Sequence, residues 1–172
     1  SDQLIMDNMD NTAVDFAIDE KLILVNESID TREEIIQKLG CLLFENGYVK
    51  DTYTHAVLHR EITYPTGLPA RVAGVAVPHT DTEHVIKPAI AIATLANPIP
   101  FYMMGSPDVE VKVEIIIMLA IHDAKLVIPV LRKIIFILEN DAALTKIKEA
   151  KTKSEIKQAM LDHIKSLSEK GK

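Results

Sequence analysis

The longest apolar run in the chain, residues 115–121, constrains the fold more than any other segment. It follows residues 111–114, in which apolar and charged side chains alternate. Alternation is typical of a half-buried strand, whereas a continuous apolar run of this length is typical of a strand covered on both faces. The sequence therefore predicts a central strand in a sheet. The run is far shorter than the roughly 18 residues that span a bilayer, so we expect no insertion into a membrane.

Strands and helices are mixed along the rest of the chain. Capping sequences of the S/T-x-x-E type mark helix starts at Thr31 and Thr152, because hydroxyl and carboxylate satisfy each other's free backbone donors. Between them, the second helix along the chain is expected after an Asp51 cap, and another helix is expected around residues 130–138, with Pro129 tolerable only in its first turn. Further apolar segments predict strands at residues 22–25, 72–77 and 89–95. This mixture predicts a sheet flanked by helices, an α/β or α+β sandwich.

The length and charge of the chain limit the class of protein. Its 172 residues suit one domain, expected at residues 19–168 after a flexible N-terminal tail of residues 1–18. A net charge of -6 disfavours broad electrostatic binding to nucleic acid. The one cysteine, Cys41, excludes an intrachain disulfide and is expected to be a small packed side chain. No signal peptide is visible, so we expect a cytoplasmic protein.

A histidine directly after a strand and a proline is the first candidate for chemistry. Residues 75–77 are apolar, Pro78 ends the strand, and His79 is the next side chain. An imidazole there is held at the end of a rigid element, and near pH 7 it is partly neutral and nucleophilic. Asp81, His84 or a backbone carbonyl could hold one ring nitrogen and leave the other free. By spacing alone, an ordinary loop histidine is the more common case.

Two groups of histidines also have spacings that occur in metal sites. His79 and Asp81 form the first half of a two-histidine, one-carboxylate iron site, and His84 lies nearby. His55 and His59 are four residues apart on one helix, but no adjacent glutamate completes an H-E-x-x-H pattern. We therefore favour solvated or packed histidines over a metal centre at both places.

Arg60 is a candidate for holding an anion. It stands beside Glu61 at the end of the second helix, where a surface charge pair of little value to stability is one interpretation. The other is a guanidinium fork that binds a phosphoryl group. The sequence has no G-x-x-x-x-G-K-[ST] loop, no G-x-G-x-x-G loop and no G-x-S-x-G elbow. If the protein handles phosphate, histidine and arginine must do so.

The order of several short motifs resembles a known family. The motifs are residues 60–61, 65–69 and 75–81, followed by 83–85, 87–91, 98–99, 104–108 and 118–121. This order is similar to that of the IIA component (EIIA) of the bacterial phosphoenolpyruvate-dependent sugar phosphotransferase system (PTS). The first three motifs resemble the mannitol/fructose superfamily, and the later ones its galactitol-like branch. The resemblance covers roughly residues 20–165.

This resemblance implies a fold, a site and partners. The implied fold is a mixed β-sheet flanked by helices, an α/β sandwich that forms a single EIIA domain. His79 maps to the histidine that accepts a phosphoryl group from the phosphocarrier protein HPr. It passes the group to a cysteine of a IIB component, which serves the IIC permease in uptake of galactitol or a related polyol or sugar. Arg60 would stabilise the phosphoryl group, the Thr66 hydroxyl or its neighbouring amides could donate to it, and His84 could orient His79. No metal, nucleotide or other cofactor is implied beyond the transient phosphohistidine.

Some features of the site and the function stay open. The mannitol-like branch has a second active-site histidine, but residues 124–129 contain none and His122 is displaced. An apolar rim around His79 is expected to include Met103 and Met104, for which core packing is the alternative. Two other functions are considered: a regulatory phosphohistidine domain that senses sugar or nitrogen status, and a metal-dependent oxygenase.

Overall fold

The computed structural model describes the backbone of residues 18–170 and the side chains of residues 18–163. Within this part of the chain one sheet is formed by β1 (Ile23–Glu27), β2 (Gly67–Leu68), β3 (Gly74–Ala76), β4 (Ala89–Met103) and β5 (Ser106–Ala120). β4 and β5 are an antiparallel hairpin, β1 is parallel to β4, and β3 is parallel to β5. The short β2 pairs with both β3 and the end of β4.

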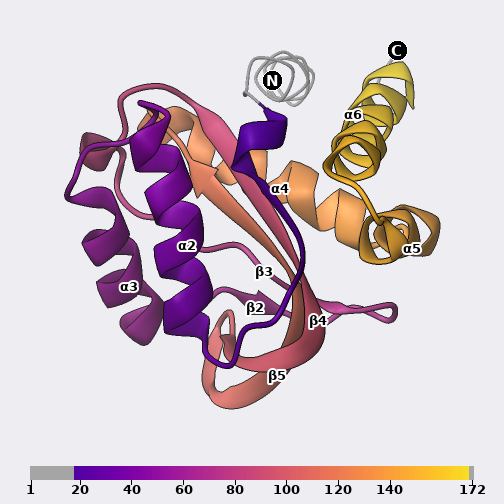
Figure 1. Ribbon diagram of the computed structural model, residues 1–172, viewed down its shortest axis with the longest axis horizontal. Coiled ribbons are helices and arrows are strands. Elements are labelled where there is room, and N and C mark those ends of the chain that lie inside the picture. The colour runs from indigo at the N-terminus through magenta and orange to yellow at the C-terminus, as the bar shows by residue number, and fades with distance from the viewer. Residues whose placement is uncertain (1–17, 171–172) are drawn as a thin grey trace.

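Helices cover both faces of this sheet. The helices α2 (Arg32–Glu45) and α3 (Tyr53–Thr63) lie on one face, and α4 (Val127–Leu138), α5 (Asp141–Glu149) and α6 (Lys153–Lys170) lie on the other (Figure 1). The described part of the chain also contains three short 3-10 helices: Glu20–Leu22 directly before β1, and Thr82–His84 and Ala124–Leu126 in connections. The prediction of a mixed β-sheet flanked by helices is confirmed.

The buried apolar side chains form two cores, one on each face of the sheet. Successive side chains of a strand point to opposite faces, so β4 contributes to both cores. Its side chains toward α4, α5 and α6 are Ile90 and Ile92, and those toward α2 and α3 are Ala89, Ala91 and Ala93. Every residue of the run 115–121 is at most 1% exposed. The prediction of a strand buried on both faces is therefore confirmed.

β4 is longer than the sequence predicted. The expected strand at residues 89–95 continues to Met103 and contains Pro98 and Pro100. Its pairing with β5 shifts register between Thr94 and Ile99, which marks an irregularity around the first proline. Proline cannot donate to a ladder but is accommodated at bulges. The strand therefore passes through a segment that has the local composition of a loop.

The ends of the helices agree with two of the three predicted caps. The backbone N–H of Glu34 donates to Thr31 Oγ1 at 3.2 Å, and that of Glu155 donates to Thr152 Oγ1 at 3.1 Å. The predicted Asp51 cap is wrong, since α3 is preceded by Thr52 and has no side-chain cap. Instead, the N–H of Tyr53, the first residue of α3, donates to a backbone carbonyl of the preceding loop, that of Lys50.

Three other expectations are corrected. The strand expected at residues 72–77 covers only Gly74–Ala76, the part that pairs with β2 and β5. Helix α5 was not predicted, although the Asn140 side chain caps it by accepting a hydrogen bond from Ala143 N–H at 3.1 Å. Cys41 is exposed, not packed, and its Sγ lies 3.2 Å from a carboxylate oxygen of Glu45.

The expected N-terminal tail falls mostly outside the described residues. Its last residue, Ile18, is described and is buried at 6% exposure in the core beneath α4, α5 and α6. Across the part of the chain that is described, no helix has both the length and the apolar character needed to cross a membrane.

Candidate active site

His79 lies in the wall of an open pocket of about 450 Å³. It follows β3 directly, and the other walls come from the end of α3, the turn between β4 and β5, and α4. These segments are distant in sequence and meet because β2 pairs with both β3 and β4. The pocket is lined by His79 together with Arg60, Thr63, Tyr64, Pro65, Thr66, Met104, Gly105, Pro107 and Leu131.

The backbone that leads to His79 is held closely against β5. Gly74 has no room for a side chain, because a Cβ atom there would lie against the carbonyl oxygen of Lys112. At the other end of the segment, Leu119 N–H donates to the Pro78 carbonyl at 3.0 Å. The sheet thus fixes the main chain on both sides of the strand end from which His79 projects.

The ring of His79 is held in one tautomer. It is 5% exposed, and its Nδ1 lies 2.7 Å from the carbonyl oxygen of Val77. Because a carbonyl only accepts, Nδ1 carries the hydrogen and Nε2 keeps its lone pair. Burial lowers the pKa of His79, as does the Arg60 cation, against the opposing effects of Val77 and Asp81. The ring is therefore neutral at pH 7, and a backbone carbonyl orients it, rather than Asp81 or His84.

Thr66 is buried beside His79, and its hydroxyl is already used. Its Oγ1 donates to Glu61 Oε1 at 2.6 Å, and its N–H donates to Glu61 Oε2 at 2.6 Å. A hydroxyl has one hydrogen, so it cannot also donate to a phosphoryl oxygen in this arrangement. The geometry therefore gives no support to the hydroxyl as a donor to a phosphoryl group, and the role of the neighbouring amides stays a prediction. Glu61, expected as part of a surface charge pair, is only 2% exposed.

Arg60 extends into the pocket from the last turn of α3. Its guanidinium carbon lies 5.2 Å from the centre of the Tyr64 ring, in a cation–π contact. Its Nε is buried and has no hydrogen-bond partner. An unsatisfied buried donor costs about 1–3 kcal/mol, so an anionic oxygen that bonded to it would be favoured. The geometry agrees better with an anion-binding side chain than with a solvated surface charge.

His84 lies in a neighbouring pocket of about 500 Å³, not in the His79 pocket. Its Nδ1 is 2.8 Å from Thr52 Oγ1, and its Nε2 is 3.6 Å from a carboxylate oxygen of Glu83. Among the described contacts, none joins His84 to His79. The geometry gives no support to His84 as the residue that orients the ring.

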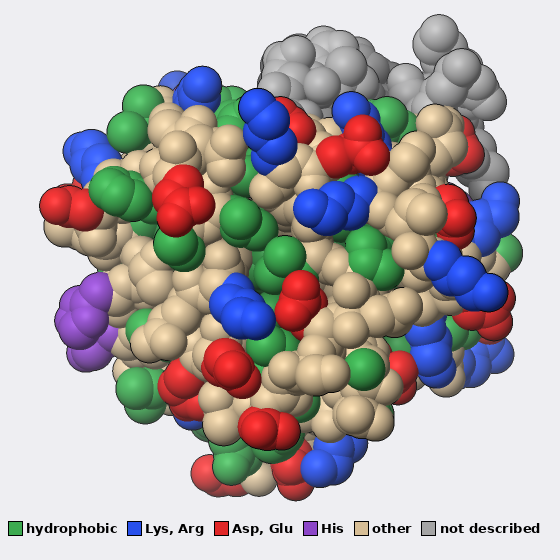
Figure 2. Space-filling view, in the orientation of Figure 1, with side chains coloured by type: hydrophobic (Ala, Val, Ile, Leu, Met, Phe, Trp, Pro, Cys, Tyr) green, Lys and Arg blue, Asp and Glu red, His purple; other side chains and the backbone are tan. Residues whose placement is uncertain are grey.

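The neighbouring pocket also contains the two other histidines considered above. His55 and His59 are exposed on α3, and Figure 2 shows histidine side chains at the left edge of the molecule, where α3 lies. Arg60 lines both pockets, the one that contains His79 and the one that contains His84 and these two histidines. Within residues 18–163, no three His, Cys, Asp or Glu side chains are grouped so that they could hold a metal ion.

Some of the residues expected around His79 do not line its pocket, and others line it in their place. Among the described residues that line its pocket there is no second histidine; His122 is exposed elsewhere, and α4 contributes Leu131. Met104 lines the pocket, whereas Met103 packs against the core beneath α2 and α3. The predicted apolar rim thus contains one of the two methionines.

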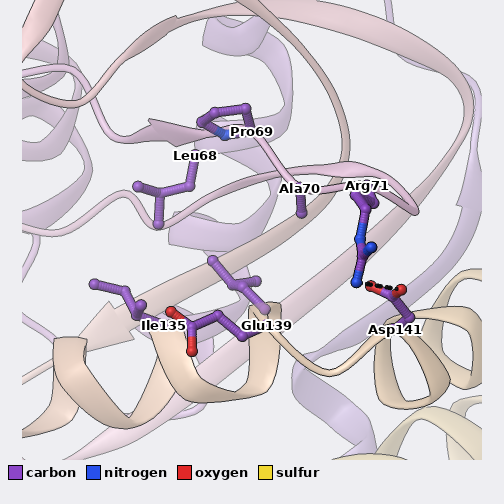
Figure 3. A pocket seen from close by; sticks show the side chains of 8 residues that line it. Leu68, Pro69, Ala70, Arg71, Ile135, Glu139 and Asp141 are labelled. Carbon is purple, nitrogen blue, oxygen red and sulfur yellow. Dashed lines mark ion pairs between the residues drawn. The ribbon is translucent and has the colours of Figure 1, made fainter.

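A separate open pocket of about 490 Å³ lies between α4 and the segment after β2 (Figure 3). Its charged side chains include Arg71, which forms an ion pair of 3.0 Å with Asp141 at the start of α5. Its remaining lining is largely apolar, with Leu68, Pro69 and Ile135. This pocket offers no nucleophile comparable to His79.

Comparison with known proteins agrees with this geometry. Residues 16–163 match a family model described as the phosphoenolpyruvate-dependent sugar phosphotransferase system, EIIA 2. The match includes every residue that lines the His79 pocket. The chain belongs to this EIIA family. The resemblance inferred from the short motifs is confirmed.

Individual relatives of this EIIA domain differ in architecture. Over 101 residues it is 28% identical to the galactitol-specific EIIA component of Escherichia coli K12. This match covers 59% of this chain and 67% of that protein. It is 36% identical over 101 residues to the transcriptional regulator ManR of Bacillus subtilis 168, covering 58% of this chain but 14% of ManR. Among solved structures, a complex of enzyme IIAMTL and phosphorylated enzyme IIBMTL from Escherichia coli has a TM-score of 0.69, 22% identity, and coverage of 86% and 99%. This last likeness concerns the fold.

Proposed function

We propose that this EIIA domain carries a phosphoryl group on His79, between the phosphocarrier protein HPr and a IIB component of the PTS. The observation that carries the proposal is the state of the ring: Nδ1–H is bonded to the Val77 carbonyl at 2.7 Å. Nε2 is thereby left unprotonated in a pocket that also contains Arg60. An unprotonated nitrogen is what attack on phosphorus requires. Membership of the EIIA family supports the same role.

The hydrogen bond at His79 allows the phosphoryl group to be transferred onto the ring and then off it, with no proton moved in either step. In the first step, the P–N bond of phospho-HPr breaks and a bond from phosphorus to Nε2 forms, while Nδ1 keeps its hydrogen on Val77. The phosphorylated ring then carries a positive charge. In the second step, a cysteine thiolate of IIB attacks phosphorus, and Nε2 recovers its electron pair as neutral imidazole, a good leaving group.

Arg60 would provide the electrostatic part of this catalysis. The transferred phosphoryl group spreads negative charge over its oxygens, and a nearby guanidinium offsets that charge. Preorganised donors and correct positioning account for most of the catalysis of such transfers. The proposal therefore assigns no metal or other cofactor to the site.

Docking of a partner protein would complete the site. Met104, Pro107 and Leu131 form an apolar border on the side of the pocket opposite α3. A partner that covers this border would exclude water from the reacting atoms. We propose HPr and IIB as these partners, in the cytoplasm, with IIC as the permease that IIB serves. Similarity to the galactitol-specific component supports galactitol or a related polyol or sugar as the transported compound.

Phosphorylation by purified PTS proteins tests this function. The chain is incubated with phosphoenolpyruvate, enzyme I and HPr, and its intact mass is measured before and after acid treatment. We expect a gain of one acid-labile phosphoryl group in the wild type and none in a folded His79→Gln variant. Unchanged labelling of that variant would sink the assignment of His79.

A regulatory role is the second candidate, because the chain is 36% identical to a segment of ManR, a transcriptional regulator. A regulatory domain would use the same phosphohistidine to report sugar or nitrogen status. Addition of candidate IIB proteins to the phosphorylated chain separates the two functions. Rapid loss of the phosphoryl group to a IIB protein supports transport, whereas retention with every IIB protein of the same genome supports regulation.

A further inference from the structure

Glu61 is the most deeply buried carboxylate in the neighbourhood of His79. It is 2% exposed, and it occupies the turn of α3 that follows Arg60. A buried carboxylate is costly unless its oxygens are bonded. Both oxygens are bonded to one residue, since Thr66 N–H and Thr66 Oγ1 each donate at 2.6 Å. Glu61 therefore holds both the backbone and the side chain of Thr66.

Thr66 in turn holds the backbone N–H of Val77, the residue before Pro78. The N–H of Val77 lies 3.2 Å from Thr66 Oγ1 and 3.3 Å from the Thr66 carbonyl oxygen. The hydroxyl can accept this bond because its hydrogen is directed at Glu61. The carbonyl of the same residue, Val77, then accepts from His79 Nδ1 at 2.7 Å. Hydrogen bonds from Glu61 to Thr66 and from Thr66 to Val77 are thus linked, through the main chain of Val77, to the hydrogen bond that holds the reactive ring.

We propose that Glu61 is a positioning residue for the phosphoryl-transfer reaction: through Thr66 it fixes Val77, whose carbonyl sets the tautomer and orientation of the His79 ring. This role rests on the phosphoryl transfer proposed above. Glu61 does not touch the reacting atoms, since its oxygens are occupied by Thr66. It acts on them through the backbone.

The chemistry of the side chain explains why a carboxylate is needed. Thr66 presents two donors to Glu61, and only a carboxylate offers two acceptor oxygens at this spacing. The amide of a glutamine has the same shape but only one acceptor. Its NH₂ group would face one of the Thr66 donors, or it would donate to the hydroxyl, whose own hydrogen would then have to turn away from residue 61. Either arrangement disturbs the Thr66 hydroxyl, which is one of the two acceptors of Val77 N–H.

A purely structural role makes a different prediction. If Glu61 only stabilised the turn between α3 and β2, its replacement would lower the stability and leave the His79 ring unchanged in the folded protein. If it positions the ring, the folded variant has an altered tautomer. The ¹⁵N chemical shifts of the His79 ring nitrogens separate the two, because they report the tautomer directly and require no phosphoryl transfer.

The test compares the wild type with Glu61→Gln and Thr66→Val at pH 8. In the wild type we expect a single tautomer with hydrogen on Nδ1, and in both variants a mixture of tautomers. Misplacement of a reactive group by about 1 Å can cost about 10²-fold in rate, so we expect kcat for phosphorylation by phospho-HPr to fall roughly 10- to 100-fold. KM for phospho-HPr should stay unchanged, since the docking surface is intact. Thr66→Ser keeps the hydroxyl, so its His79 tautomer and its kcat should match those of the wild type.

The control is Glu139→Gln, which makes the same chemical change at an exposed glutamate at the end of α4. Wild-type tautomer and kcat in folded Glu61→Gln would overturn the proposal. If Glu61→Gln does not fold, Thr66→Val decides instead, and a wild-type tautomer in it would overturn the proposal. If the wild type itself is not phosphorylated, the proposed function fails, while the tautomer measurement still decides whether Glu61 positions the ring.

Discussion

The charge state of His79 depends on its burial and on one cation. Desolvation and Arg60 both favour the neutral ring, and they outweigh Val77 and Asp81, so the pKa of His79 lies below the ordinary 6.5. In the proposed function the neutral ring is the nucleophile, so phosphorylation should persist below pH 6.5 and fall only as the pH drops through the lowered pKa. An NMR titration of the ring protons of His79 measures this midpoint directly. A midpoint at or above 6.5 would contradict the argument.

Removal of the Arg60 charge should move that midpoint upward. Arg60→Gln abolishes the repulsion between guanidinium and imidazolium, so the pKa of His79 should rise toward its ordinary value, although burial still holds it down. The same NMR titration measures the change. Arg71→Gln serves as the control, because Arg71 pairs with Asp141 in a different pocket and should leave the midpoint of His79 where it is.

Arg60 should also matter for the rate. Loss of one preorganised electrostatic donor typically costs 10²–10³ in rate, so Arg60→Ala should slow phosphorylation of His79 by on the order of 10²-fold. Arg60→Lys should restore part of the loss, since lysine keeps the charge but not the two parallel donors. Rates are measured with phospho-HPr by rapid quench. Equal rates for the wild type and Arg60→Ala would return Arg60 to the surface interpretation.

Glu61 should make the stability depend on pH. Burial raises its pKa from 4.5 to about 7, even though the bonds from Thr66 and the charges of Arg32 and Arg60 oppose the shift. Between these values the folded state binds more protons at Glu61 than the unfolded state, so the free energy of unfolding falls as the pH rises. At about 1.4 kcal/mol per pH unit, the loss amounts to about 3 kcal/mol and is complete above pH 7.

Urea unfolding of the wild type and Glu61→Gln at several pH values checks this dependence. The difference between the two proteins in the free energy of unfolding should change across the window from pH 4.5 to 7 and stay constant outside it. Other titrating groups are common to both proteins and cancel in the difference. A difference that stays flat across the window would mean that the Glu61 carboxyl keeps an ordinary pKa in the folded state.

Single residues at the site were predictable where the sequence pattern alone defines their position. His79 and Arg60 line one pocket, as the family resemblance implied, whereas the pattern alone singled out each of them separately. Glu61 was missed because an Arg-Glu pair in a last helical turn has the composition of a solvated surface. Glu61 is buried because the chain turns back after α3 and forms β2, and no local sequence signal predicts this turn. The same turn brings the Thr66 hydroxyl within hydrogen-bond distance of the Glu61 carboxylate.

At the scale of elements, α2 and α3 are in close contact where Gly40 faces Thr54. A Cβ atom at Gly40 would lie against Thr54 Oγ1 and 3.0 Å from Thr54 Cβ, so no rotation of the threonine side chain relieves the contact. Alanine has a better helix propensity than glycine by about 1 kcal/mol, but overpacking typically costs 1–3 kcal/mol. We expect Gly40→Ala to destabilise the fold by about 1 kcal/mol.

Chemical denaturation of single and double variants measures this contact. Because Thr54→Ala removes Oγ1 and the methyl group, the double variant Gly40→Ala/Thr54→Ala should recover part of the loss. The control Gly47→Ala has no neighbour within 4 Å of its added Cβ, but its φ of 81° makes it costly for a different reason, so no second change should rescue it. Additive effects at Gly40 and Thr54 would show that the two helices do not meet there.

Elements were predictable where their signals are local. The caps at Thr31 and Thr152 lie within four residues of the helices they start, and both are present in the structure. The true lengths of β3 and β4 depend on partners far away in sequence, since β4 continues past Pro98 only because β5 pairs with it on the other side of the irregularity. Helix α5 is short and follows α4 after a gap of two residues, so its cap at Asn140 was not distinguished from the end of α4.

At the scale of the whole molecule, the His79 pocket is made by both layers of helices and by the sheet between them. Arg60 comes from α3 on one face, Leu131 from α4 on the other, and His79 and Met104 from the sheet and its hairpin turn. The chemistry therefore requires the complete fold, although each layer has its own core. In the proposed function this arrangement separates two roles: the α3 side provides charge, and the α4 side provides the apolar border on which a partner would dock.

This separation predicts that changes on α4 affect docking and leave the chemistry intact. Leu131→Gln replaces a half-buried apolar side chain at the border of the pocket by a polar one of similar size. Loss of part of a buried leucine contact costs about 1 kcal/mol, so KM for phospho-HPr should rise about fivefold. The value of kcat and the tautomer of His79 should stay unchanged, because the chain from Glu61 to the ring does not pass through α4. Phe136→Gln is the matched control: it is 51% exposed on the same helix but outside the pocket, so KM should not change. A fall in kcat at constant KM in Leu131→Gln would mean that α4 acts on the reacting ring itself, and the division between a charged side and a docking side would be wrong.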